Sequence, residues 1–73
     1  MTNTALLEKR IQDCGYKKKF LAARLGLSRH GFLRKVRGDC DFTATEVGIL
    51  RELLGITSLD DVCAIFFNHK VDL

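Results

Sequence analysis

Residues 21–28 read Leu-Ala-Ala-Arg-Leu-Gly-Leu-Ser, and this stretch holds the parts of a tight turn between two short helices. Ala22 is a small residue that lets two helices cross closely, and Gly26 can take the positive φ that a three-residue turn needs. Leu27 places an apolar side chain where the turn meets a core, and Ser28 is a good N-cap for the next helix. The stretch therefore predicts a helix, a turn and a second helix.

The rest of the chain also has the periodicity of helices rather than strands. Apolar residues recur three or four positions apart, as at Leu7 and Ile11, and no alternating pattern of any length occurs. Glycines separate the periodic segments. The predicted helices cover about residues 4–13, about residues 18–25, the stretch from the cap Ser28 to Gly38, the stretch from Thr43 to Gly55, and the stretch from about Ser58 to Phe67.

The length of 73 residues is that of one domain. We therefore expect an all-α, compact five-helix domain over residues 1–73. Within it, the helix-turn-helix covers about residues 17–37, and a C-terminal tail, readable as an extended arm, covers residues 68–73.

The fourth predicted helix has the most complete start signal in the chain. Thr43 and Glu46 have the spacing of a capping box, in which each side chain accepts a hydrogen bond from the other residue's backbone. Phe42 and Val47 flank the box at the positions of a hydrophobic staple. These four residues predict where the helix begins.

Composition excludes several classes of protein. The chain is 47% hydrophobic and 29% charged, which is typical of a globular domain and not of a disordered one. Its longest apolar run, residues 62–67, is too short to span a membrane, and the N-terminal residues lack the apolar stretch of a signal peptide. Cys14, Cys40 and Cys63 are too widely spaced for a disulfide framework or a zinc site, so we expect free thiols, no metal and no cofactor.

Charge is distributed unevenly along the chain. Residues 1–14 sum to zero, residues 15–38 to +8 and residues 39–73 to −5, which together give the net charge of +3. The middle segment contains no acid, and such an asymmetry inside one small domain predicts a polyanionic partner. Its basic residues are Lys17, Lys18, Lys19, Arg24, Arg29, Arg34, Lys35 and Arg37.

Several of these cations stand where a helix dipole disfavours them. Residues 17–19 open the second predicted helix, and Arg29 and His30 open the third. A helix N-terminus is the positive end of the dipole, and it repels an exposed cation by roughly 0.3–1 kcal/mol. A phosphate between the two helix starts would turn this repulsion into attraction. The conflict with local preference therefore indicates a functional surface.

Residues 15–38 resemble the helix-turn-helix of the lambda-repressor/Cro-like family of DNA-binding proteins. The expected five helices also fit that family's domain, so the resemblance covers nearly the whole chain. The residues that carry it are Leu21-Ala22, Leu25-Gly26-Leu27-Ser28, Phe32, Val36 and Gly38.

A narrower likeness is to a group of small phage-encoded regulators of that superfamily. The chain departs from the family at Lys17 and Lys18, where Thr or Ser and then Gln are usual, so Lys18 would meet a phosphate as a point charge with less orientation. The segments similar to the phage group are Lys35-Val36-Arg37-Gly38, Phe42-Thr43, Glu46-Val47, Ile65-Phe66-Phe67 and Lys70-Val71.

The resemblance implies that the third helix enters the major groove of double-stranded DNA. The positions that the family uses for base edges hold Arg29, His30, Leu33 and Arg34, and Leu33 has completion of the core as its alternative role. Arginine forks onto guanine O6 and N7, and leucine contacts a thymine methyl. The residues expected at phosphates are Lys17, Lys18, Lys19, Ser28, Lys35 and Arg37.

The expected function is that of a sequence-specific transcriptional regulator, a repressor that occupies an operator in the cytoplasm of a bacterial host. We expect a homodimer on a palindromic operator, joined through Phe66, Phe67 and the tail. The alternative is a protein-interaction module that binds and modulates a separate repressor. We expect no enzyme, because His30 and His69 lack a nucleophilic partner and no carboxylate pair is apparent.

Overall fold

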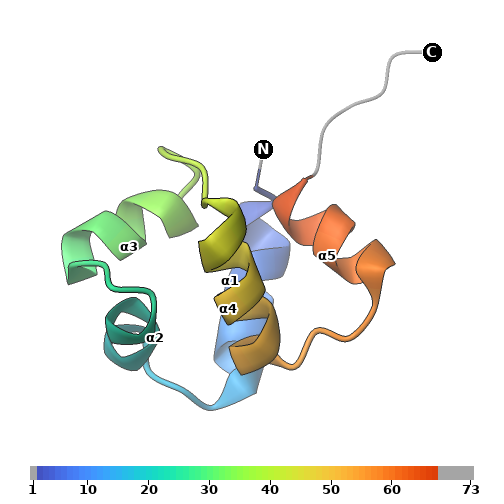
Figure 1. The fold of residues 1–73 in the computed structure, drawn as a ribbon, viewed down its shortest axis with the longest axis horizontal. Helices are drawn as coiled ribbons and strands as arrows, with labels where there is room; N and C mark the ends of the chain where they lie inside the picture. The colour runs from blue at the N-terminus through green and yellow to red at the C-terminus, as the bar shows by residue number, and fades with distance from the viewer. Residues whose placement is uncertain (1, 68–73) are drawn as a thin grey trace.

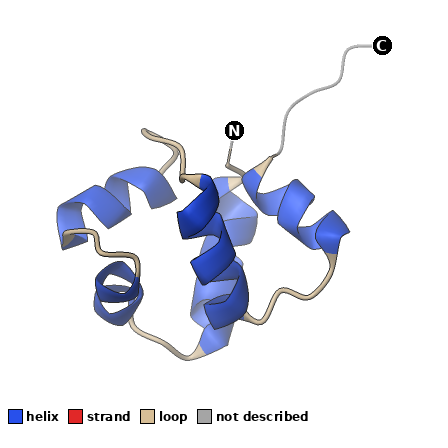
Figure 2. Cartoon of the chain, viewed as in Figure 1, coloured by secondary structure: helices blue, strands red, loops and turns tan. Residues whose placement is uncertain are grey.

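The computed structural model describes residues 2–67, which form five α-helices and no β-strand (Figure 2). The prediction of an all-α five-helix domain is therefore confirmed for these residues. The expected C-terminal arm over residues 68–73 lies outside them. The helices are α1 (Thr4–Cys14), α2 (Lys18–Arg24), α3 (Arg29–Val36), α4 (Ala44–Leu54) and α5 (Leu59–Phe66).

Hydrogen bonds within a few residues set the helix starts. At α4 the predicted capping box is present: the Glu46 N–H donates to Thr43 Oγ1 at 3.2 Å, and the Thr43 N–H donates to Glu46 Oε1 at 2.9 Å. Ser58 caps α5 through its side chain, as Ser28 caps α3. At α1 the cap is Asn3, whose Oδ1 accepts the Leu6 N–H at 3.2 Å. The sequence pattern had not singled out Asn3.

The core draws side chains from all five helices. Phe42, in the segment before α4, contacts Phe32 of α3 and Phe66 of α5 edge to face, with ring centroids 6.4 and 5.8 Å apart. Such pairs add to the free energy gained by removing apolar surface from water. The buried hydrophobic residues are Leu7, Ile11, Leu21, Ala22, Phe32, Val36, Val47, Leu50, Leu54, Ile56, Val62, Ile65 and Phe66.

The helices are ordered along the long axis of the molecule (Figure 1). α2 and α3 contact each other at one end, α1 and α4 pack together in the middle, and α5 lies at the other end against α1. Two polar contacts add to the packing of α1 against α5: the N–H of Asn3, the N-cap of α1, donates to the Ile65 carbonyl oxygen, and Arg10 pairs with Asp61 at 3.1 Å. No helix within residues 2–67 combines the length and apolar composition needed to cross a membrane.

Candidate nucleic-acid interface

A tight turn joins α2 to α3 and fixes the angle between them. Gly26 has a φ of 71°, the left-handed conformation predicted for it. The Leu27 N–H donates to the Ala22 carbonyl oxygen at 3.0 Å, and the Leu27 side chain packs against the core. Ala22 itself is buried. The local sequence therefore holds α3 at a defined position against α2.

Ser28 starts α3. Its backbone is extended, and its Oγ accepts the Gly31 N–H at 3.0 Å. Since the hydroxyl uses a lone pair in this bond, its own O–H remains able to donate to an acceptor such as a phosphate oxygen. No acidic residue stands in the first turn of α3, so the cationic side chains there have no local counter-charge.

The two faces of α3 divide as the sequence pattern predicts. Phe32 and Val36 are buried. Arg29, His30 and Arg34 are exposed, and no acid among the described residues lies within ion-pairing distance of either arginine. Leu33 is partly exposed and does not belong to the core cluster. All four candidate base-contacting residues thus have surface available.

The start of α2 presents two free lysines and one paired lysine. Lys17 is the N-cap residue and its side chain makes no capping hydrogen bond. Lys17 and Lys19 are exposed, with no acidic partner among residues 2–67. Lys18 instead pairs with Glu8 of α1, its Nζ lying 3.0 Å from Oε1. The pair is partly exposed, so it reduces the positive charge that Lys18 offers without burying it.

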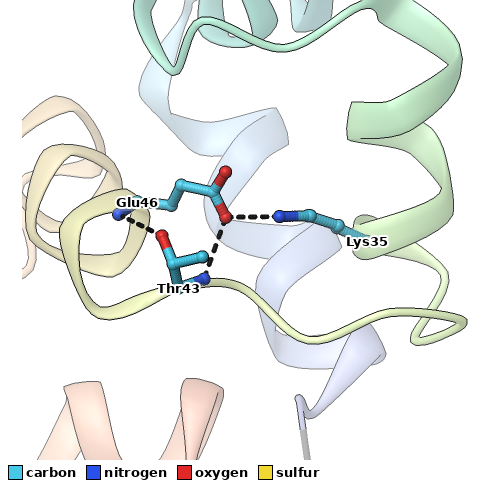
Figure 3. Close-up of polar contacts among 3 residues, drawn as sticks. All are labelled: Lys35, Thr43 and Glu46. Carbon is cyan, nitrogen blue, oxygen red and sulfur yellow. Dashed lines mark hydrogen bonds and ion pairs between the residues drawn. The ribbon is translucent and has the colours of Figure 1, made fainter.

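Lys35 has a different role from the one expected. Its Nζ lies 2.6 Å from Glu46 Oε1, and the two side chains are only 17% and 11% exposed (Figure 3). The same carboxylate oxygen accepts the Thr43 N–H in the capping box, so Lys35 joins the end of α3 to the start of α4. We therefore remove Lys35 from the phosphate-contacting set, because its charge is already neutralised within the molecule.

The environment of Glu46 favours its charged form. Burial by itself raises the pKa of this carboxyl group. The hydrogen bonds from Lys35 and the Thr43 backbone, together with the charge of Lys35, outweigh burial and lower the pKa below its ordinary value of 4.5. Glu46 is therefore ionised at neutral pH and can hold the lysine.

Arg37 is exposed and only weakly paired. Its Nη2 lies 3.4 Å from Asp39 Oδ2, and both side chains are more than half exposed. An ion pair of this kind is screened by water and salt and contributes little. Arg37 therefore stays in the phosphate-contacting set, though it is the member farthest along the chain from the two helix starts.

Sequence reasoning missed two features of this surface. Arg24 was counted in the acid-free segment but was given no DNA contact; on α2 it is exposed and has no acidic partner among the described residues. The Lys35–Glu46 pair had no sequence signal, because eleven positions separate the two residues. The cations of residues 15–38 that have no acidic partner in the described part of the chain are Lys17, Lys19, Arg24, Arg29 and Arg34.

The described residues also bear on a metal site, on disulfide bonds and on the expected dimer surface. Within residues 2–67 no group of three or more His, Cys, Asp or Glu side chains is arranged to hold a metal ion. The three cysteines are free thiols. Phe66, expected at a dimer surface, is only 4% exposed and belongs to the core, whereas Phe67 is about half exposed. Phe66 is therefore removed from that surface, because its ring packs on Phe42 instead.

No protein-family model matches this chain, and neither a curated protein nor a solved structure matches it at a significant level. The functional interpretation therefore rests on the residues of α2 and α3.

Proposed function

We propose that this protein is a sequence-specific regulator that binds double-stranded DNA with α3 in the major groove, in the manner of lambda-repressor/Cro-like helix-turn-helix proteins. The observation that carries the proposal is the pairing pattern of the cations. Of the cations in residues 15–38, Lys18, Lys35 and Arg37 have acidic partners, and the others have none within residues 2–67: Lys17, Lys19, Arg24, Arg29 and Arg34. These residues lie at the start of α2 and along α2 and α3, two contacting helices at one end of the molecule. Elsewhere among the described residues, the exposed cations without an acidic partner are Lys9 on α1 and Arg51 on α4.

The chemistry of the exposed groups suits the two kinds of DNA contact. Arg29 and Arg34 project from α3, and guanidinium groups fork onto guanine O6 and N7 in the major groove. His30 supplies a donor or an acceptor, and Leu33 an apolar contact for a thymine methyl. Phosphate contacts fall to Lys17, Lys18, Lys19, Ser28 and Arg37, which set register and affinity rather than sequence preference.

Regulation in this proposal works by occlusion. A protein that occupies an operator excludes other proteins from it, and one short recognition helix gains specificity when two copies bind adjacent half-sites. We accordingly propose a phage-type repressor acting on the DNA of a bacterial cell. Its two-copy arrangement on a palindromic operator stays a prediction.

The test is selection of duplexes from a random pool, followed by titration of the selected duplex with three variants. Arg29→Ala is expected to cost roughly 1–3 kcal/mol of binding free energy and to relax the preference at one base pair. Lys17→Ala is expected to weaken all duplexes about equally. Arg51→Ala is the matched control, because Arg51 is an exposed arginine on α4, outside the basic segment.

Two results would contradict this proposal. Equal, sequence-independent losses from Arg29→Ala and Lys17→Ala would remove α3 as the helix that reads bases. Failure of the chain to bind any duplex at low salt would favour the alternative, a module that binds a separate repressor protein.

A further inference from the structure

An apolar groove lies on the outer face of α2, next to the turn from α1. It has a volume of about 410 Å³ and is lined by Gly15, Tyr16, Lys17, Lys19, Phe20 and Ala23. The rings of Tyr16 and Phe20 stack with their centroids 4.8 Å apart, and these residues are 46% and 43% exposed. The groove thus offers two aromatic rings to solvent beside two lysines that have no acidic partner among residues 2–67.

A second unpartnered apolar surface runs along α5. Leu59 and Cys63 lie four residues apart on one face of α5, and Phe67 is the residue at its C-cap, with a non-helical φ of −122°. All three are exposed, and we call them the α5 stripe. Leu59 is 75% exposed, the highest value for any large hydrophobic residue among residues 2–67. The exposed Asp60 lies beside this stripe, and Val62 on the opposite face is buried in the core.

The two surfaces match in composition and oppose each other in charge. We propose that the α5 stripe of one copy of this chain docks into the α2 groove of another copy, with Leu59 and Phe67 against Tyr16 and Phe20 and with Asp60 facing Lys19. Helices α2 and α5, which carry the two surfaces, lie toward opposite ends of the long axis (Figure 1), so the surfaces do not cover each other within one molecule.

The geometry of this contact is head to tail. Each bound copy leaves one groove and one stripe free, so association continues as an open chain of copies unless the rotation between neighbours closes a ring. A surface made of a few exposed side chains lies at the small end of protein interfaces, which are weak and transient. Self-association therefore depends on protein concentration, and the lysine–aspartate part makes it weaken as salt rises.

The experiment uses two variants that each block one surface. Phe20→Asp places an acid in the groove and keeps the stripe, while Leu59→Asp places an acid on the stripe and keeps the groove. Both positions are exposed, so neither substitution enters the core. Thr45→Asp is the matched control, since it introduces the same acid at an exposed position of α4 that borders neither surface.

Sedimentation of the full chain without DNA gives the readout. The parent and Thr45→Asp are expected to gain mass with concentration, and each blocking variant alone is expected to remain monomeric. An equimolar mixture of the two blocking variants is expected to form a 1:1 pair and nothing longer, since the intact stripe of one fits the intact groove of the other. Tyr16 is the single tyrosine in a chain without tryptophan, so its fluorescence reports occupation of the groove.

Three results would overturn the proposal. A parent that stays monomeric up to its solubility limit at low salt shows no such contact. A Phe20→Asp variant that associates like the parent shows that the contact does not use the groove. A mixture that forms no 1:1 pair excludes the head-to-tail geometry.

One consequence rests on the proposed function. Lys17 and Lys19 line the groove and also stand in the phosphate-contacting set, so duplex DNA and a second copy would compete for them. At high protein concentration, self-association of the parent is expected to inhibit its binding to DNA. Leu59→Asp is expected to bind the selected duplex like the parent at low concentration and to show no such inhibition at high concentration. If no duplex binds at all, the sedimentation result still decides the self-association.

Discussion

Lys35 is the residue whose role changes most between sequence and structure. In the sequence it is one of eight cations in an acid-free segment. In the structure its ammonium group is largely buried against Glu46, whose carboxylate also closes the capping box of α4. The ammonium group of Lys35 therefore stabilises the fold, because removing it leaves the Glu46 carboxylate poorly solvated and without a cation.

We expect Lys35→Met to lower the free energy of unfolding by about 2 kcal/mol, because methionine keeps the unbranched stem but leaves Glu46 without its cation. Lys18→Met is the matched control, since the Lys18–Glu8 pair is about 40% exposed on each side and such pairs contribute under about 1 kcal/mol. Urea denaturation of both variants measures the difference. Equal losses would mean that burial of the Lys35 pair has no energetic consequence.

The lowered pKa of Glu46 predicts that the free energy of unfolding depends on pH in the acid range. Its pKa is lowered in the folded state, so the unfolded chain binds a proton more readily, and the stabilisation is fully present above the ordinary value of 4.5. It is lost as the pH falls through the folded pKa. Glu46→Gln keeps a side chain able to complete the capping box but removes the charge.

We therefore expect the stability difference between the parent and Glu46→Gln to be largest near neutral pH and to shrink in acid, below that lowered pKa. Urea midpoints of the two proteins across this range test it. A difference that is independent of pH would show that the charge of Glu46 contributes nothing.

At the scale of the element, α3 contains an unusual residue in its first turn. Gly31 adopts helical backbone angles, where glycine is roughly 1 kcal/mol less favourable than alanine. A Cβ at this position would lie 3.2 Å from Ser28 Oγ, the atom that caps the helix. The gain expected from helix propensity is therefore opposed by crowding of the cap.

We expect Gly31→Ala alone to change the free energy of unfolding by less than about 0.5 kcal/mol. In a Ser28→Gly background, where no hydroxyl crowds the new methyl group, the same change is expected to stabilise by up to about 1 kcal/mol. Thermal melts of the four proteins give the coupling between the two positions. Identical effects of Gly31→Ala in both backgrounds would show that the hydroxyl moves aside freely.

On the scale of the whole molecule, the arrangement of charge matters more than its sum. The basic helices α2 and α3 lie at one end and α5, with Asp60 and Asp61 in its first turn, at the other. A net charge of +3 therefore understates the positive potential that a polyanion meets at the α2–α3 end.

If the proposed function holds, binding to duplex DNA will weaken steeply with salt. About four phosphate contacts per molecule give a slope of log K against log[salt] near −3.6, because each contact displaces counterions. Lys17→Ala is expected to make this slope shallower by about one. Titrations at several salt concentrations measure both values, and a slope near zero would contradict phosphate-mediated binding.

The sequence by itself determined the helices and the turn between α2 and α3. Their ends depend on interactions within about four residues, such as the Thr43–Glu46 box, the Ser28 cap and the positive φ of Gly26. The inward face of each helix also follows from periodicity alone, which is why Phe32 and Val36 were correctly placed in the core. Such local and periodic rules need no knowledge of how helices pack.

Only the tertiary structure decided which charged side chains form ion pairs and which aromatic side chains are exposed to solvent. Lys35 and Glu46 are eleven positions apart, Lys18 and Glu8 ten, and Arg10 and Asp61 fifty-one. Whether such residues meet depends on the relative placement of whole helices, which packing of the shared core fixes and a sequence pattern does not encode. The same placement buried Phe66 beside Phe42 and left Tyr16 and Phe20 exposed, so the packing of the helices selected the molecule's available surfaces.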